Sequence, residues 1–194
     1  MHPLEVPTDI REVIRTNDLF ALQLALSRDR KRGKELGQYG ITPLHRANSL
    51  AAINMLLSSG ANPNAIDNDG FTPLHAAVQR NQYDIVVRLL KAGAKVDTAI
   101  IYAKKREMAE LLLSHKTSIN NASLLNDALH SAVATGRIDV TELLLEYGVN
   151  INSININGKT PLHQAAYYKR LDIVRLLINK AMSPLNIENH PAPH

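Results

Sequence analysis

The tetrapeptide Thr-Pro-Leu-His occurs three times in this chain of 194 residues. It stands at 42–45, 72–75 and 160–163, and a glycine precedes each copy at two residues' distance. A fourth, eroded copy reads Asp-Ala-Leu-His at 127–130. Self-similarity of this kind indicates repeated structural units, each too small to bury an apolar face alone. The units must therefore stack on one another.

The sequence pattern of each unit predicts two helices and a protruding turn. It is clearest in residues 64–93. Thr72 before a proline is a typical helix start, because the hydroxyl can cap the helix and proline needs no amide partner at the first position. A polar break at 80–82 leads into a second helix from Ile85 to Lys91, and Gly93 stands where a left-handed stop is expected. The polar stretch 64–70 has turn chemistry and predicts a hairpin-like finger.

These residues resemble the ankyrin repeat. The matching features are the Thr-Pro-Leu-His tetrapeptide, Ala-Ala in the first helix, an Ile-Val…Leu-Leu block in the second, and Gly-Ala followed by Asn. The resemblance covers about residues 39–186. It implies an all-α repeat fold, namely an ankyrin-repeat α-solenoid with short hairpin fingers.

The expected domain organisation places a capping helix pair before the repeats and a flexible tail after them. The capping pair takes residues 1–38, the repeat domain 39–186 and the tail 187–194. The repeats are expected at 39–66, 69–97, 98–120 (shortened), 124–153 and 157–186. Thr98 directly follows Asp97 without a finger, which predicts a gap in the row of fingers near residue 98. Ala181 replaces the stop glycine of the last repeat, so we expect its outer face to be exposed.

Composition gives no support for catalysis. The chain has no cysteine, and it has no GxSxG elbow, no glycine-rich phosphate loop and no paired-carboxylate motif. The recurring histidines would lie about 8 to 10 Å apart in stacked units, too far to share one ion. The resemblance implies instead that they form hydrogen bonds between units. We therefore predict no enzyme, no cofactor and no metal site, and a structural motif made of Thr42, Pro43, His45, Thr72, Pro73, His75, His130, Thr160, Pro161 and His163.

Charge and hydropathy bear on partners and location. A net charge of +4 and an aromatic share of 4% disfavour nucleic-acid binding. Two basic clusters, 28–34 in a loop and 104–106 at a helix end, are expected to be solvated, with a nuclear address or an anionic partner as the alternative for the first. No apolar run is long enough to span a membrane, and no Sec-type leader is visible. We expect a cytoplasmic protein, acting in a host cytosol if it is a secreted bacterial effector.

The resemblance also implies where a partner would bind. In ankyrin stacks, contacts concentrate on the finger tips and on the residues that follow Ala-Ala of the first helix, along a concave groove. Phe71 and the pair Tyr167 and Tyr168 are the expected anchors, because aromatic side chains often dominate interfaces. The alternative is that one tyrosine packs on the adjacent unit. The groove positions are Ile41, Arg46, Asn68, Asp69, Phe71, Gln79, Arg80, Ala134, Thr135, Ile156, Asn157, Lys159, Tyr167 and Tyr168.

The sequence favours a protein–protein interaction module, acting as an adaptor, inhibitor or targeting scaffold through the concave groove. Three alternatives stay open, one of which is that the chain is a regulatory fragment of a larger protein whose effector segment is absent. A self-associating structural unit would use the exposed face of the last repeat and form a homo-oligomer. A polyanion or nucleic-acid binder would use the basic segment 28–34, and the acidic and amide residues among the groove positions disfavour it.

Overall fold

The computed structural model of the protein describes residues 9–115 and 121–182, and these residues form helices and turns without a strand. The chain divides into two compact units, Met1–Ala99 and Ile100–His194, here called unit 1 and unit 2. The fold class is the one predicted, an all-α repeat solenoid. The tail expected at 187–194 lies outside the described residues.

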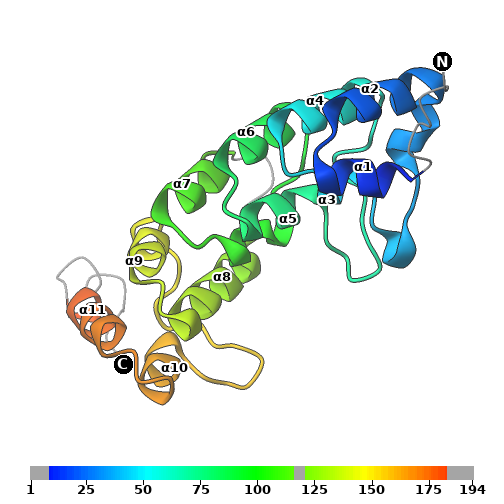
Figure 1. Cartoon of the computed structure of the whole chain (residues 1–194). Coiled ribbons are helices and arrows are strands. Elements are labelled where there is room, and N and C mark those ends of the chain that lie inside the picture. Colours follow the sequence, from blue (N-terminus) through cyan, green and yellow to red (C-terminus); the bar gives the residue numbers. More distant parts are fainter. Residues whose placement is uncertain (1–8, 116–120, 183–194) are drawn as a thin grey trace. The chain divides into compact units, whose positions relative to one another are not determined.

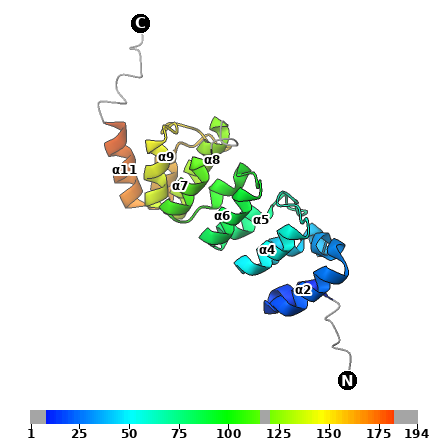
Figure 2. The same ribbon diagram turned by 90° about the horizontal axis from the view of Figure 1, so that it is seen from above.

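Unit 1 consists of two layers of helices (Figures 1 and 2). In the inner layer α1 packs on α3 and α3 on α5, whereas in the outer layer α2 packs on α4 and α4 on α6. Two short 3-10 helices lie between α2 and α3. The elements are α1 (Ile10–Thr16), α2 (Leu19–Arg28), η1 (Arg30–Lys34), η2 (Gln38–Gly40), α3 (Pro43–Arg46), α4 (Leu50–Ser58), α5 (Pro73–Gln79) and α6 (Tyr83–Lys91).

Unit 2 repeats this arrangement. Its inner helices α8 and α10 pack on each other, and its outer helix α9 lies between α7 and α11 (Figure 1). The 3-10 helix η3 (Asp97–Tyr102) spans the division between the units. The remaining elements are α7 (Arg106–Ser114), α8 (Ala122–Thr135), α9 (Ile138–Glu146), α10 (Pro161–Tyr167) and α11 (Leu171–Ala181).

The Thr-Pro-Leu-His motif starts a helix at each of its three copies. At α5 the Thr72 hydroxyl accepts a hydrogen bond from the amide of His75, and the ring of His75 accepts one from the amide of Thr72. This reciprocal cap satisfies two amides that a helix start would otherwise leave unpaired. The eroded copy at 127–130 lacks proline, and there α8 begins earlier, at Ala122, with Asn121 as its cap. Without a proline at this position, the eroded motif lies inside α8 rather than at its start.

The two fingers that the structure describes, 61–71 and 149–159, are turns closed by backbone hydrogen bonds. The amide of Asp67 donates to the carbonyl of Phe71, and the amide of Asn155 donates to that of Lys159. No finger separates α6 from η3, which follows the turn at Gly93 after only a few residues. Unit 1 ends at Ala99, a few residues after the point in the sequence where this finger is missing.

Aliphatic side chains fill the core between the two layers of each unit. The largest ones that are fully buried are Ile14, Leu22, Leu44, Ile53, Leu56, Leu74 and Leu89 in unit 1, and Ile100, Met108, Leu112, Leu129 and Leu144 in unit 2. The last repeat differs from this pattern, because Leu162 is 41% exposed although its counterparts Leu74 and Leu129 are completely buried. No described helix combines the length and apolar character that crossing a membrane requires.

Candidate functional site

The repeated histidines form hydrogen bonds that join neighbouring repeats within each unit. His45 and His75 are buried, and the Nδ1 atom of each accepts a hydrogen bond from the backbone amide of the threonine three residues before it. We therefore assign the proton to Nε2, which donates to the carbonyl of Phe71 in one case and to the Thr98 hydroxyl in the other, at 3.1 and 2.8 Å. Each ring thus links its own repeat to the next.

In the described part of unit 2, His130 forms a similar link between repeats. The ring nitrogens of His130 lie 2.8 Å from Gln164 Oε1 and 3.2 Å from the Ser153 carbonyl, so this histidine also joins two repeats. His163 keeps its Thr160 contact but is exposed. Among residues 9–115 and 121–182, no three side chains of the metal-binding types gather at one point.

We expect the stability of the protein to fall as the pH drops from about pH 7 to about pH 5. Burial lowers the pKa values of His45 and His75 below their ordinary value. The native state then binds fewer protons than the unfolded chain, so stability is present above pH 6.5 or so and declines below it. The slope is at most about 1.4 kcal/mol per pH unit for each histidine. Thermal unfolding over this pH range measures it.

A variant carrying His45→Gln and His75→Gln provides the control, since the amide oxygen of glutamine can still accept the threonine amide. Its unfolding temperature should vary less with pH than that of the wild type. An equally steep pH dependence in both proteins would show that other groups are responsible.

Unit 1 carries a depression of about 360 Å³ between the inner helices and the first finger. Five of its lining residues belong to the predicted groove set, and the sequence analysis missed the other three. The predicted residues are Ile41, Arg46, Phe71, Gln79 and Arg80; the others are His45, Asp67 and Ala76.

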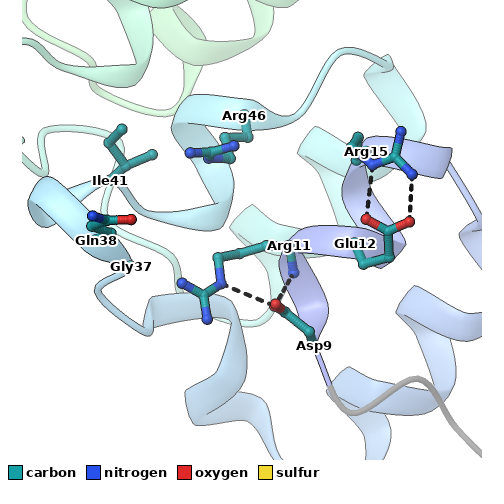
Figure 3. Close-up of a pocket in the computed structure, with 8 residues that line it drawn as sticks. All are labelled: Asp9, Arg11, Glu12, Arg15, Gly37, Gln38, Ile41 and Arg46. Atoms are coloured by element: carbon teal, nitrogen blue, oxygen red, sulfur yellow. Dashed lines mark hydrogen bonds and ion pairs between the residues drawn. The ribbon is translucent and has the colours of Figure 1, made fainter.

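A second depression of about 310 Å³ adjoins the first and shares Ile41 and Arg46 with it. Figure 3 shows arginines from two inner helices around it, Arg11 and Arg15 on α1 and Arg46 on α3. Arg11 pairs with Asp9 at 2.9 Å and Arg15 with Glu12 at 2.5 Å. We call the two depressions together the unit 1 groove.

Arg46 and Arg80 distinguish the unit 1 groove electrostatically. Neither guanidinium forms an ion pair with a carboxylate among the residues that the structure describes. Partial desolvation, with repulsion from Arg46, lowers the pKa of Arg80. The nearby carboxylate of Asp67 accepts hydrogen bonds from the amides of Asp69 and Phe71 through Oδ1, which stabilises the finger.

The last repeat of unit 2 carries a further depression of about 410 Å³, here called the unit 2 depression. Tyr167 and Tyr168 line it with their rings edge to face, 5.0 Å apart at an angle of 85°. Tyr167 is 80% exposed and Tyr168 is 47% exposed, so this surface offers aromatic area to solvent. The predicted Asn157 and Lys159 also line it, together with Asn155, His163 and Gln164, which the sequence analysis missed.

Several expected groove residues also make contacts within the fold. Phe71 is partly buried rather than exposed, and its ring packs edge to face with the buried ring of His75, with centroids 5.3 Å apart. The Thr135 hydroxyl donates to the Ser131 carbonyl and accepts from Arg137 Nε, and the Ala134 carbonyl accepts from Arg170. These two residues therefore support the repeat stack.

The other predicted positions are surface residues outside these depressions. Asn68 and Asp69 are exposed at the tip of the first finger, and Ile156 is 100% exposed on the second finger. The basic cluster at 28–34 is not a loop, because Arg30–Lys34 forms η1. Arg106 in the other cluster is paired with Glu110 and Glu146, which the expectation of a solvated helix end did not include.

The sequence holds only a weak signal for the arginines on α1. Arg11 and Arg15 are one helical turn apart and so share a face of α1. Because α1 lacks the tetrapeptide, nothing in the sequence aligns this face with the groove positions of the later repeats.

The chain belongs to the ankyrin-repeat family. A sequence profile described as ankyrin repeats (3 copies) matches residues 12–100 and 98–189, which is most of the chain. Ankyrin repeats are generally protein–protein interaction modules.

Individual relatives are diverse. The chain is 38% identical over 119 residues to the putative ankyrin repeat protein FPV223 of fowlpox virus, which covers 56% of this chain and 84% of the viral protein. It is 30% identical over 145 residues to the putative palmitoyltransferase ZDHHC13 of Danio rerio, covering 66% of this chain but only 22% of that protein. The potassium channel AKT2/3 of Arabidopsis thaliana is 28% identical over 150 residues, covering 72% of this chain and 19% of the channel.

A solved structure shares the fold. Its chain comes from the complex of the predatory endopeptidase Bd0816 of Bdellovibrio bacteriovorus with the immunity protein Bd3460. The TM-score is 0.78 at 25% sequence identity, and the match covers 91% of this chain and 100% of that one.

Proposed function

We propose that this protein is a non-enzymatic binding module that holds a partner protein on its concave surface, as an adaptor, inhibitor or targeting scaffold. The observation that carries the proposal is the pair Tyr167 and Tyr168. These rings are exposed, they line a depression, and their hydrophobic area contributes little to folding because it remains in water. Aromatic side chains presented in this way are common anchors of protein interfaces.

The unit 1 groove supports the same proposal. It places Arg46 and Arg80 beside the partly buried Phe71, and arginine and aromatic residues are the types that most often dominate binding energy. Both surfaces are built on short helices fixed by capping and by the buried histidines. A fixed scaffold loses little conformational entropy when a partner binds.

Affinity capture from a cell lysate tests the proposal. The wild-type chain is compared with a triple variant carrying Phe71→Ala, Tyr167→Ala and Tyr168→Ala. We expect at least one protein to be retained by the wild type and lost from the variant, because truncating interface aromatics typically weakens binding by about tenfold or more each. Circular dichroism must show that both chains are folded.

The chain offers a matched control on its outer helices. Phe20, Tyr83 and Tyr147 are an exposed phenylalanine and two exposed tyrosines at α2, α6 and the end of α9. Their triple alanine variant should retain the same partner as the wild type. If both variants lose the partner, or if neither does, the partner does not bind specifically through Phe71, Tyr167 and Tyr168.

Self-association is a second candidate, favoured by the last repeat. Leu162, Ile178 and Met182 are exposed there, on α10, α11 and the residue that follows α11. Sedimentation at increasing protein concentration separates this function from partner binding: a concentration-dependent dimer supports self-association and a constant monomer excludes it.

A further inference from the structure

We propose that the unit 1 groove binds an extended acidic segment of a partner protein, with carboxylates opposite Arg46 and Arg80 and an apolar side chain between them. This inference rests on the proposed function and specifies the chemistry of the partner. The charges, the apolar residues and the shape of the groove support it.

Arg46 and Arg80 carry charge that no described carboxylate compensates. Four arginines line the groove, and two of them are paired, with the α1 N-cap Asp9 and with Glu12 of α1. Arg46 and Arg80 have no such partner among the described residues, although both face the same depression. In Figure 3 no dashed line joins the Arg46 side chain to any of the other residues drawn. A carboxylate opposite each of these two guanidinium groups would supply the missing countercharge and could accept bidentate hydrogen bonds.

Arg46 and Arg80 are two like charges that line one depression. Partial desolvation lowers the pKa of Arg80, and the charge of Arg46 lowers it further. Like charges held near a low-dielectric surface destabilise each other, and a bound anion reverses the sign of that energy. An acidic ligand would therefore relieve this repulsion.

The groove also presents apolar surface beside these charges. Ile41 belongs to both depressions, and Phe71 lies at the finger side of the one that holds Arg46 and Arg80. Because the two depressions share Ile41 and Arg46, they form one elongated surface rather than a socket for a single small anion. An extended peptide, whose side chains alternate in direction, fits such a surface with one apolar residue between two acidic ones.

The acidic residues of the groove favour a peptide over a nucleic acid. Asp9, Glu12 and Asp67 line the same surface. A nucleic-acid backbone carries a charge at every nucleotide and would meet these carboxylates as well as the arginines. A peptide can place its acidic residues opposite Arg46 and Arg80 alone.

The test measures fluorescence anisotropy of a short labelled peptide in which a leucine is flanked by aspartate and glutamate. Its twin carries the corresponding amides, and a single-stranded oligonucleotide of similar charge serves as a third probe. The full chain is compared with a variant carrying Arg46→Glu and Arg80→Glu, and with a matched charge reversal in the basic segment, Arg28→Glu and Arg30→Glu. A variant carrying Arg46→Lys and Arg80→Lys keeps the charge and loses the bidentate geometry.

We expect the acidic peptide to bind the wild type about tenfold or more tightly than its amide twin, and more weakly as salt rises. Reversing Arg46 and Arg80 should weaken binding by about tenfold or more, the lysine variant should be intermediate, and reversing Arg28 and Arg30 should have little effect. Equal binding of the twin, loss of binding on reversing Arg28 and Arg30, or no binding of the peptide would overturn the inference. So would tighter binding of the oligonucleotide through Arg46 and Arg80.

The outcomes separate this inference from the proposed function. If the acidic peptide does not bind but the aromatic triple variant still loses its captured protein, the concave surface binds a partner of other chemistry. If the capture shows no dependence on the aromatic residues, the proposed function itself is wrong, whatever the peptide does.

Discussion

Arg137→Ala is expected to lower the free energy of unfolding of unit 2 by about 2 to 4 kcal/mol. Arg137 lies between α8 and α9, and its guanidinium donates to the carbonyls of Ile101 and Ala103 and to the hydroxyls of Ser131 and Thr135. Desolvation lowers its pKa, as expected for a cation partly enclosed by protein. Removing the side chain would leave two backbone carbonyls of the η3 region without these donors, and unsatisfied polar groups in a partly buried site are costly.

Urea denaturation followed by circular dichroism measures this effect. Arg175→Ala on α11 is the matched control, because Arg175 is exposed and should cost less than about 0.5 kcal/mol. Arg137→Lys should recover only part of the loss, since one ammonium cannot reproduce the forked geometry of the guanidinium. Similar values for Arg137→Ala and Arg175→Ala would show that the carbonyls find other donors.

Leu89→Ala is expected to lower the free energy of unfolding of unit 1 by about 2 to 5 kcal/mol. Leu89 lies on α6 and is completely buried between the two helix layers. The substitution removes buried apolar area and leaves a cavity that the capped, closely packed helices can fill only in part.

Leu36→Ala is the corresponding control, because the same change is made where the side chain is 72% exposed. It should leave the denaturation midpoint almost unchanged. A comparable loss at both positions would mean that the cost reflects the leucine-to-alanine change in the unfolded chain rather than packing in the core.

The helices could be predicted from the sequence wherever a residue fixes the backbone locally. Pro43, Pro73 and Pro161 each begin a helix at the predicted position, and Gly93 has the positive φ expected of a stop residue. The eroded motif at 127–130 lacks this proline, and there α8 begins before the motif, at Ala122. The 3-10 form of η3 was not predicted either, since helical hydrophobic periodicity does not separate an α-helix from a tighter turn over so few residues.

Some residues of the unit 1 groove could be proposed from the repeat pattern alone. Arg46 and Arg80 follow the first-helix motif of their repeats, one and five residues after its histidine, and both line the unit 1 groove. Arg137 was missed because its acceptors Ile101 and Ala103 are more than thirty residues away in sequence. Thr135 was assigned to the groove because the sequence gives no sign that its hydroxyl is already engaged by Ser131 and Arg137.

The links between successive repeats have a consequence for folding kinetics. The side-chain hydrogen bonds that join neighbouring repeats, from His75 to Thr98 at one extreme and from Arg106 to Glu146 at the other, connect residues 23 to 40 positions apart. Every such contact closes a loop of similar, modest length, and the entropy of closure grows only slowly with length. Topology therefore gives no single pair of repeats a large advantage as the folding nucleus. The nucleus is set by local stability, and substitutions in the most stable pair will change the folding rate the most.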